Sequence, residues 1–411
     1  MGERGVAGRR VVLGVCGGIA AYKAVDVCRR LVDAGALVSP VLTAGATRFV
    51  APLTFSALAT EAARTSLWDG AEPIPHTRLG QAADVVVVAP ATARLLGAYA
   101  AGIADDLLTA TLLATRAPVV VCPAMHTEMW EHPAVRHNVS VLRQRGVHVV
   151  GPTTGRLAGG DEGAGRLADP ADVVAAVEAA LTPQDLAGVK VVVTAGGTRE
   201  PIDAVRFIAN RSSGRQGHAL AEEAAARGAR VTLVTASMLP PPPGVDVVTV
   251  ATAEEMARAV LERSPAADVV VMAAAVADFR PRHPVAAKLS KADGVPALEL
   301  ELTPDILAAV GRAKPAGQVV VGFAAETSDV AARARAKLVA KGADLVVGND
   351  VSAPDAGFEV GTNRAVVVEE DGTITEVPLV DKRRLAAIVL DTVVRRLPGP
   401  PIPAHRADPT P

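Results

Sequence analysis

Short aliphatic runs alternate with amphipathic segments along the chain. The first half contains the runs RVVLGV (residues 10–15), ALVSPVLT (36–43), DVVVVAP (84–90) and APVVVC (117–122). Between the first two runs, apolar residues recur at the spacing of one helix face and stop at Gly35, a residue typical of helix ends. Continuous valine runs separated by helices are typical of strands buried on both faces. The pattern therefore predicts a parallel sheet with helices on both sides.

The second half repeats this order. Its runs are KVVVTA (190–195), RVTLVT (230–235), DVVVMAAAVADF (268–279), QVVVGFAA (318–325) and ADLVVGND (343–350). We therefore expect an α/β protein with two tandem doubly wound, Rossmann-like domains and mainly parallel sheets. The expected domains span residues 1–181 and 189–397, with the polar stretch TPQDLAG (182–188) as the linker. Residues 398–411 are rich in proline and are expected to be disordered.

Composition narrows the possible partners. The net charge of −2 and an aromatic content of 2% give no reason to expect a nucleic-acid partner. The three cysteines, Cys16, Cys28 and Cys122, form no CxxC pair, which fits a reducing cytoplasm and argues against a cysteine-based zinc site. No apolar run approaches the ~20 residues needed to span a membrane, so no membrane association is expected.

The first apolar run imitates a secretion signal. Basic residues precede VVLGVCGGIAA (11–21), whose cleavage motif would end at Cys16. However, Val15 is too large for the position before that cysteine, and Gly17 and Gly18 interrupt the apolar run. We interpret this run as a buried first strand of a cytoplasmic protein.

Each half carries a glycine turn that leads into a helix, at Gly17-Gly18 and at Gly196-Gly197. Helix amino termini with such turns can bind phosphate groups. Neither turn matches G-x-G-x-x-G, and the second strands end in threonine rather than in the acidic residue that binds a nicotinamide ribose. A nicotinamide-dependent reductase is therefore only a weakly supported alternative.

The octet PAMHTEMW (123–130) follows the strand run VVVC. Ligands of open α/β sheets bind at the carboxyl ends of the strands, where this octet lies. Its position alone favours the simpler explanation, a loop whose Met and Trp fill a gap in the core. His126-Thr-Glu128 has the H-x-E form of zinc deaminases, but the cysteines that would complete such a site are absent, and no metal ligands can be named.

Taken together, the motifs resemble two enzyme families in a fixed order. GGIAAYK (17–23), His76, APATA (89–93), AGIADDLL (101–108) and PAMHTEMW resemble the flavin-dependent phosphopantothenoylcysteine decarboxylases. TAGGTREPIDAVRFIANRSSGRQG (194–217), AAAVADF (273–279), KLSK (288–291) and GFAAET (322–327) resemble the phosphopantothenate–cysteine ligases. The order matches the bifunctional bacterial enzymes of coenzyme A biosynthesis from about Arg9 to Leu397.

The resemblance implies a flavodoxin-like first domain that binds FMN. Gly17, Gly18 and Ile19 would face the flavin phosphate, Thr43 the ribityl chain, and Ala89, Pro90, Ala91 and Thr92 the isoalloxazine edge. His76 is the implied catalytic base, although on its own it could be an ordinary loop histidine. FMN would oxidise the cysteine thiol, which creates the electron sink that decarboxylation needs.

Two positions depart from the decarboxylase pattern. The family has Asn in Pro-x-Met-Asn, where this chain has His126, which we expect to act as a substituted clamp for the substrate carboxylate. Gly159 stands where family members carry a flap cysteine that protonates the reduced intermediate. Either another acid serves here, such as water or His126, or the reaction stops at the oxidised enethiol.

For the second half, the resemblance implies a nucleotide-binding domain that joins phosphopantothenate to cysteine through an acyl-cytidylate made from CTP, with Mg²⁺ or Mn²⁺. Asn210 would hold the acyl-cytidylate, and Lys288 would assist its formation and the release of pyrophosphate. The implied CTP site comprises Met272, Ala273, Ala274, Asp278, Lys288, Pro304, Asp305, Ile306, Leu307, Phe323, Lys337 and Lys341. Lys337 and Lys341 are four residues apart and share one helix face, and Asp305-Ile306 opens a helix.

Each of these residues also has an ordinary explanation. Phe323 could be core, the lysines could be surface residues, and Ser213 could cap a helix. A first half that only binds flavin and assembles the oligomer remains an alternative to an active decarboxylase. The resemblance implies a homo-oligomer, with trimeric flavin halves and dimeric ligase halves combining into a dodecamer.

Overall fold

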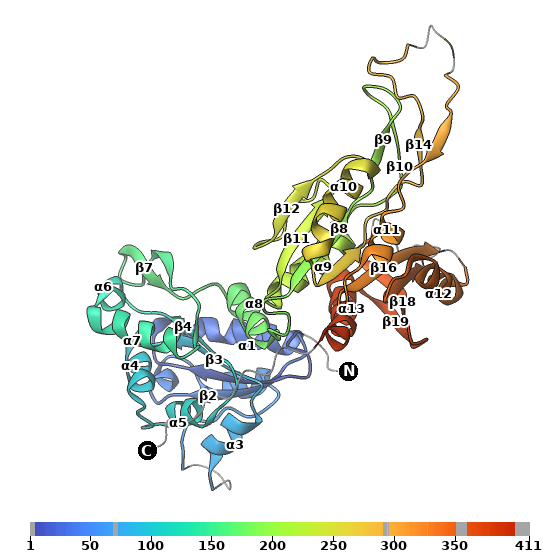
Figure 1. Ribbon diagram of the computed structural model, residues 1–411. Coiled ribbons are helices and arrows are strands. Elements are labelled where there is room, and N and C mark those ends of the chain that lie inside the picture. The colour runs from blue at the N-terminus through green and yellow to red at the C-terminus, as the bar shows by residue number, and fades with distance from the viewer. Residues whose placement is uncertain are drawn as a thin grey trace, which may run out of the picture. The chain divides into compact units, whose positions relative to one another are not determined.

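The computed structural model describes residues 5–68, 73–290, 294, 296–326, 328–350 and 360–398. The chain forms two compact units, Met1–Pro183 and Gln184–Pro411 (Figure 1). The proline-rich tail expected to be disordered lies outside the described residues, apart from Pro398. No helix among the described residues is long and apolar enough to cross a membrane.

The first unit is built on a parallel sheet with the strand order β2-β1-β3-β4-β5. The strands are β1 Arg10–Val15, β2 Leu37–Leu42, β3 Val85–Ala91, β4 Val119–Pro123 and β5 His148–Val149. This is the flavodoxin-like order of a doubly wound sheet. The predicted strands of the first half are confirmed.

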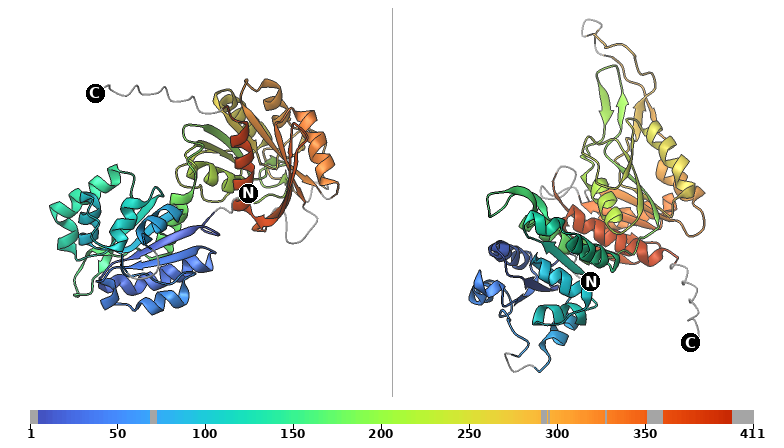
Figure 2. Two further views of the ribbon diagram at one scale, coloured as in Figure 1. Left: turned by 90° about the horizontal axis from the view of Figure 1, so that it is seen from below. Right: turned by 90° about the vertical axis from the view of Figure 1, so that its left-hand side faces the viewer.

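Helices cover both faces of this sheet (Figure 2). They are η1 Ile19–Tyr22, α1 Lys23–Asp33, η2 Ala46–Arg48, α2 Pro52–Leu58, α3 Pro75–Ala82, α4 Ala93–Ala101, α5 Leu107–Ala114, α6 Thr127–Glu131, α7 Pro133–Gln144 and α8 Pro170–Leu181. Leu13 packs with α1 and α8 in one core, whereas Val12, its neighbour, packs with α4, α5 and α7 in the other. Because successive side chains of a strand point to opposite faces, the continuous valine runs supply both cores.

A short β-hairpin packs beside the carboxyl end of β4. Its strands are β6 Thr153–Arg156 and β7 Glu162–Arg166. Met125 donates its N–H to the carbonyl oxygen of Gly165 at 3.0 Å, so β7 lies directly against the PAMH segment. A Cβ atom at Gly165 would lie 2.1 Å from the carbonyl oxygen of Met125, which leaves no room for a side chain.

The second unit contains a larger mixed sheet with the order β12-β11-β8-β13-β16-β17-β18-β19. Its strands are β8 Lys190–Ala195, β11 Arg230–Thr235, β12 Asp246–Thr249, β13 Val269–Met272, β16 Val319–Glu326, β17 Leu345–Asp350, β18 Thr362–Glu369 and β19 Ile374–Asp381. The pairings from β12 to β17 are parallel, and those of β17 with β18 and β18 with β19 are antiparallel. The predicted parallel strands are confirmed.

Two groups of helices cover this second sheet. The helices are α9 Arg215–Ala226, α10 Ala253–Arg263, η3 Ser264–Ala266, α11 Ile306–Ala313, α12 Val330–Lys341 and α13 Lys382–Arg396. α9 and α13 contribute to one core, and α10, α11 and α12 to the other. Doubly wound architecture is thus confirmed in both units.

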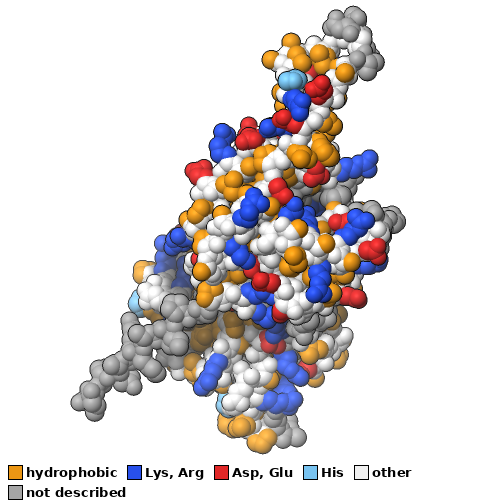
Figure 3. All heavy atoms as spheres, turned by 45° about the vertical axis from the view of Figure 1, so that its right-hand side comes forward, with side chains coloured by type: hydrophobic (Ala, Val, Ile, Leu, Met, Phe, Trp, Pro, Cys, Tyr) orange, Lys and Arg blue, Asp and Glu red, His pale blue; other side chains and the backbone are white. Residues whose placement is uncertain are grey.

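Two further strand pairs extend from the second sheet (Figure 1). They are β9 Arg199–Pro201 with β10 Phe207–Ala209, and β14 Phe279–Pro281 with β15 Leu300–Leu302. Apolar side chains are exposed among charged ones along this extension (Figure 3), including Phe207 and Leu302.

The stretch predicted as a linker is partly structural. Leu186 is fully buried in a core of the second unit, and its N–H donates to the carbonyl oxygen of Arg227 at 3.1 Å. The neighbouring Asp185 accepts hydrogen bonds from the Arg227 guanidinium, including one of 2.7 Å from Nε. Leu186 and Asp185 therefore belong to the packing of the second unit.

Candidate functional site

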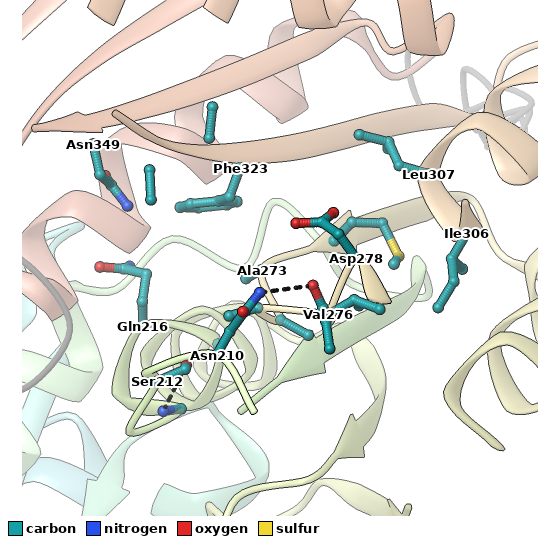
Figure 4. Close-up of a pocket in the computed structure, with 18 of the residues that line it drawn as sticks. Asn210, Ser212, Gln216, Ala273, Val276, Asp278, Ile306, Leu307, Phe323 and Asn349 are labelled. Carbon is teal, nitrogen blue, oxygen red and sulfur yellow. Dashed lines mark hydrogen bonds between the residues drawn. The ribbon is translucent and has the colours of Figure 1, made fainter. Parts of the chain in front are cut away.

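A cavity of about 680 Å³ lies in the second unit, at the carboxyl ends of β13 and β16 (Figure 4). Residues that the sequence singled out line it together: Asn210, Met272, Ala273, Ala274, Asp278, Pro304, Asp305, Ile306, Leu307, Phe323, Lys337 and Lys341. These residues come together because the loops that follow neighbouring parallel strands emerge at the same edge of a sheet.

Hydrogen bonds hold the segment after β13 in place. The N–H of Ala274 donates to Thr194 Oγ1 at 3.0 Å, and the N–H of Ala277 donates to Thr198 Oγ1 at 2.9 Å. Asn210 Nδ2 donates to the carbonyl oxygen of Val276 at 2.9 Å (Figure 4). The Asn210 amide is thereby oriented within the cavity wall.

Two lysines of α12 reach the cavity. Lys337 Nζ donates to the carbonyl oxygen of Phe323 at 2.7 Å, and burial, together with the charge of Lys341, lowers the pKa of Lys337. Lys341 pairs closely with Asp305, which also accepts the N–H of Ala308 at 3.0 Å at the start of α11. Although burial opposes it, these hydrogen bonds hold the pKa of Asp305 below its usual value. The two ammonium groups and the amino terminus of α11 together favour an anionic ligand.

The cavity also has polar residues that the sequence did not reveal. We call Gln216, Asn349, Asn363 and Lys382 the distal polar cluster. Asn349 is the next-to-last residue of the predicted strand ADLVVGND (343–350), and this position near a strand end was the signal available in the sequence. Lys382 follows the helix cap Asp381 and resembles a surface residue in the sequence, yet only 7% of it is exposed.

Lys288 is not among the residues that line the cavity. It is exposed and lies after β14, on the extension. Its neighbour Leu289 donates an N–H to Asp203 Oδ2 at 3.2 Å, which ties this segment to β9 and β10. The structure thus separates Lys288 from the other residues assigned to the CTP site.

In the first unit, the predicted flavin residues meet at the ends of β1, β2 and β3. A Cβ atom at Gly17 would lie 2.5 Å from the backbone of Gly45, whereas nothing lies within 4 Å of the corresponding position at Gly18. Thr43 donates its N–H to the carbonyl oxygen of Val15 at 3.0 Å. Ile19 is 62% exposed beside this turn. The open space above Gly18, at the start of η1 and α1, fits a phosphate group.

The APATA segment adjoins this turn. The N–H of Cys16 donates to the carbonyl oxygen of Pro90 at 3.2 Å, and Thr92 caps α4 by accepting the N–H of Leu95 at 3.4 Å. Ala89 and Ala91 are fully buried. The edge that the sequence assigned to the flavin ring is therefore assembled beside the glycine turn.

The two histidines of the predicted decarboxylase site lie on different elements. His76 is the second residue of α3, and its buried Nδ1 atom has no hydrogen-bond partner among the described residues. His126 precedes α6, and its ring bridges Glu128, through Nδ1, and Asp161, through Nε2 at 3.1 Å. Hydrogen bonds from the ring to Glu128 and then to Asp161 raise the pKa of His126.

Gly159 lies against the same histidine. A Cβ atom at Gly159 would lie 3.7 Å from His126 Nε2. The two departures from the family pattern are therefore neighbours in space. Cys16 and Cys122 are fully buried, and burial raises the pKa of their thiols to about 11 and about 12. Both thiols are protonated at neutral pH.

No group of three or more His, Cys, Asp or Glu side chains that could hold a metal ion occurs in the part of the chain that the structure describes.

Comparison with known proteins identifies the family. Residues 186–397 match the DNA/pantothenate metabolism flavoprotein C-terminal domain, and residues 3–182 match the flavoprotein family. The coenzyme A biosynthesis bifunctional protein CoaBC of Mycobacterium tuberculosis is 50% identical over 409 residues, covering 95% of this chain and 97% of its own. This chain belongs to the family of bifunctional coenzyme A biosynthesis proteins.

Relatives from other bacteria carry the same name and also match nearly the whole chain. The bifunctional protein CoaBC of Bacillus subtilis is 45% identical over 392 residues, covering 94% of this chain and 96% of its own. That of Escherichia coli is 43% identical over 399 residues, covering 95% of this chain and 98% of its own. The crystal structure of the C-terminal domain of a coenzyme A biosynthesis bifunctional protein CoaBC aligns with 52% of this chain and 97% of its own, with 38% identity and a TM-score of 0.45. The three bifunctional relatives and the two family matches confirm the resemblance found in the sequence motifs.

Proposed function

We propose that the second unit joins phosphopantothenate to cysteine and that the first unit decarboxylates the product to phosphopantetheine. The assembly of Asn210, Asp278, Lys337 and Lys341 in one cavity carries the ligase part of this proposal. Its volume of about 680 Å³ fits a ligand pocket for two small substrates.

The ligase chemistry needs charge neutralisation more than proton transfer. A carboxylate is a poor electrophile, and CTP activates it as an acyl-cytidylate, from which the amine of cysteine displaces CMP. Asn210 would hold the acyl-cytidylate, and Lys337 and Lys341 would stabilise the triphosphate. Mg²⁺ or Mn²⁺ would enter with the nucleotide as its counterion. Lys288 would act here only if its exposed segment moves toward the cavity.

The ligase is tested by incubating the purified chain with phosphopantothenate, cysteine, CTP and Mg²⁺ and measuring pyrophosphate and CMP. Both products are expected. Asn210→Ala is expected to abolish CMP release and, because it also removes the hydrogen bond to Val276, to lower stability by about 0.5–1.5 kcal/mol. Pyrophosphate formation that does not depend on phosphopantothenate would contradict the proposal. Replacing CTP by ATP measures nucleotide selectivity.

For the first unit we propose that FMN is the cofactor. Gly17, Gly18 and Ile19 would bind its phosphate, Thr43 its ribityl chain, and Ala89, Pro90, Ala91 and Thr92 its ring edge. The open space above Gly18 supports this assignment. Bound there, FMN would supply the reversible two-electron oxidation that makes the cysteine carboxylate able to leave as carbon dioxide. His76 would serve as the base, and His126, in its charged form, would bind the substrate carboxylate.

The decarboxylase is tested anaerobically with FMN-loaded protein and phosphopantothenoylcysteine, resolving the products by mass. Phosphopantetheine would show that the reaction is complete without a flap cysteine. A product two mass units lighter would indicate oxidative decarboxylation without re-reduction. No reaction would favour the alternative that this unit is a flavin-binding scaffold, which the neighbouring departures at His126 and Gly159 motivate.

We further propose that the protein is a cytoplasmic homo-oligomer, with trimeric flavin units and dimeric ligase units in a dodecamer. The exposed apolar residues of the strand extension support self-association. Light scattering on the full chain tests this proposal, and a monomer would contradict it.

A further inference from the structure

The segment that carries His126 packs directly against the β6–β7 hairpin. The N–H of Met125 donates to the carbonyl oxygen of Gly165 at 3.0 Å. A Cβ atom at Gly163 would lie 2.3 Å from Thr127 Oγ1, so this glycine, like Gly165, has no room for a side chain. The close contact of the two backbones fixes the hairpin turn beside the His126 ring.

The two ring nitrogens of His126 face different groups. Nδ1 bonds Glu128 on α6, whereas Nε2 lies 3.1 Å from Asp161 Oδ2 in the hairpin turn. Nε2 is also 3.7 Å from the Cβ position of Gly159, and Asp161 is the other residue that approaches this position within 4 Å among those described. The Asp161 side chain is 68% exposed, so it can turn away and leave Nε2 facing the open space beside Gly159.

The proposed decarboxylase function, on which this inference rests, requires an acid. Cleavage of the bond to the carboxylate leaves its electron pair in an enethiolate, which must take a proton at the carbon that lost carbon dioxide. Cys16 and Cys122 are unsuited to this task, because both are fully buried and burial raises the pKa of their thiols to about 11 and about 12. Gly159 in the hairpin turn has no side chain to offer.

His126 carries a proton at the appropriate place. Its hydrogen bonds to Glu128 and then to Asp161 raise the pKa of the ring, so the imidazolium persists to a higher pH than in a free histidine. An imidazolium that pairs with the substrate carboxylate remains beside the same carbon after carbon dioxide has left. An imidazole also titrates much closer to neutral pH than the buried thiols, which suits a general acid.

We propose that His126 is the acid that protonates this carbon, through Nε2. The N–H bond of Nε2 breaks as the C–H bond forms, so the enethiolate becomes a thioaldehyde and the ring becomes neutral. The thioaldehyde carbon then takes back hydride from the reduced flavin to give the thiolate of phosphopantetheine. The ring and the thiolate regain their protons from water. Asp161 is a positioning residue that holds the Nε2–H toward the hairpin turn until the substrate carboxylate displaces it.

The test compares the products that FMN-loaded protein forms anaerobically from phosphopantothenoylcysteine, resolved by mass. The wild type is expected to yield phosphopantetheine. His126→Asn keeps an amide that can bind the carboxylate but removes the acid, which is expected to slow protonation about 100-fold or more. The enethiol, two mass units lighter than phosphopantetheine, is therefore expected to accumulate in this variant.

Two further variants serve as rescue and control. His126→Asn combined with Gly159→Cys places a thiol in the space that Nε2 faces and is expected to restore phosphopantetheine. His137→Asn replaces an exposed histidine on α7 and is expected to give the products of the wild type. If the Asn variant does not retain FMN, measured by its absorbance, His126→Gln replaces it.

The role of Asp161 is tested by pH dependence. Asp161→Asn is expected to lower the pKa of the His126 ring, measured by NMR in the absence of substrate. The pH above which the enethiol appears among the products is expected to fall by the same amount. A lower ring pKa with an unchanged product profile would contradict a proton transfer from His126.

Three other outcomes would separate this assignment from the proposed function. Phosphopantetheine as the sole product of His126→Asn would overturn the acid, and so would a variant that consumes no substrate, because His126 would then act before protonation. A wild type that yields the enethiol alone would overturn the acid and leave decarboxylation intact. A wild type that does not react at all would overturn the decarboxylase function and the acid with it.

Discussion

The Nε2 atom of His126 lies 3.1 Å from Oδ2 of Asp161 and joins the start of α6 to the turn of the β6–β7 hairpin. Glu128 bonds the other ring nitrogen, Nδ1. Both carboxylates favour the imidazolium form, so His126 holds its proton to a higher pH than a free histidine. This contact between two sequence-distant segments is the basis of the first prediction.

Removing either carboxylate is expected to lower the pKa of His126. Glu128→Gln is expected to have the larger effect and Asp161→Asn the smaller, because the bond to Glu128 is the leading cause of the shift. NMR titration of the His126 ring measures both. A folded-state pKa above the unfolded value means that the contribution to stability is present at low pH and is lost as the pH rises through the folded pKa. An unchanged titration in both variants would contradict this relationship.

The glycine turn of the first unit provides a matched pair of substitutions. Gly17→Ala is expected to destabilise the first unit by about 1–3 kcal/mol, since its Cβ would lie 2.5 Å from the backbone of Gly45, and to reduce FMN retention. Gly18→Ala meets nothing within 4 Å and is expected to keep the wild-type unfolding midpoint. Trp68 and Trp130 both belong to the first unit, so fluorescence-detected unfolding measures this effect directly. Equal midpoints for the two variants would rule out the close approach.

The buried guanidinium of Arg227 is expected to stabilise the second unit through Asp185. Its side chain is 1% exposed, and Asp391 approaches it at 3.2 Å from the other side. Asp185→Asn is expected to cost about 1.5–3 kcal/mol, the range of a hydrogen bond to a charged group, because the buried guanidinium loses a charged partner. Asp26→Asn breaks an exposed pair with Arg30 within α1 and is expected to change stability by less than about 0.5 kcal/mol. The second unit contains no tryptophan, so circular dichroism is the required readout. Similar losses for the two substitutions would contradict the prediction.

The stability of the second unit is expected to depend on pH through Lys382. Burial, and then the charge of Arg215, lowers the pKa of Lys382 to about 8. Burying the charged lysine lowers stability below pH 8, and this penalty is relieved as the pH rises from about 8 to 10.5. Lys382→Met removes the titrating group and is expected to remove this rise in stability, which unfolding followed by circular dichroism across this pH range measures. The same rise in both proteins would exclude Lys382 as the responsible group.

The resemblance to the phosphopantothenate–cysteine ligases named the residues of the candidate ligase site, and the strand runs explain why many of them meet. The runs before Asp278 and around Phe323 predicted strands of a parallel sheet, and the structure pairs these two strands and brings the loops after them into one cavity. Unlike the other residues assigned to the CTP site, Lys288 does not line the cavity, because the segment after β14 lies on the strand extension and not at the cavity edge. No periodic pattern in that segment signalled the extension, whose short strands pair antiparallel over three residues each.

The sequence by itself determined the two doubly wound halves and their glycine turns, whereas the residues of the candidate sites came from the resemblance of its motifs to two enzyme families. This information is local: a valine run buried on both faces and a helix stripe are properties of consecutive residues. Only the tertiary structure decided that Lys382 is a cavity residue. Gln216 meets Asn363 across 147 positions and Lys382 across 166, because the antiparallel strands β18 and β19 return the chain so that α13 packs beside α9. The tertiary structure likewise placed Gly159 and Asp161 against His126, since the hairpin folds back onto the end of β4.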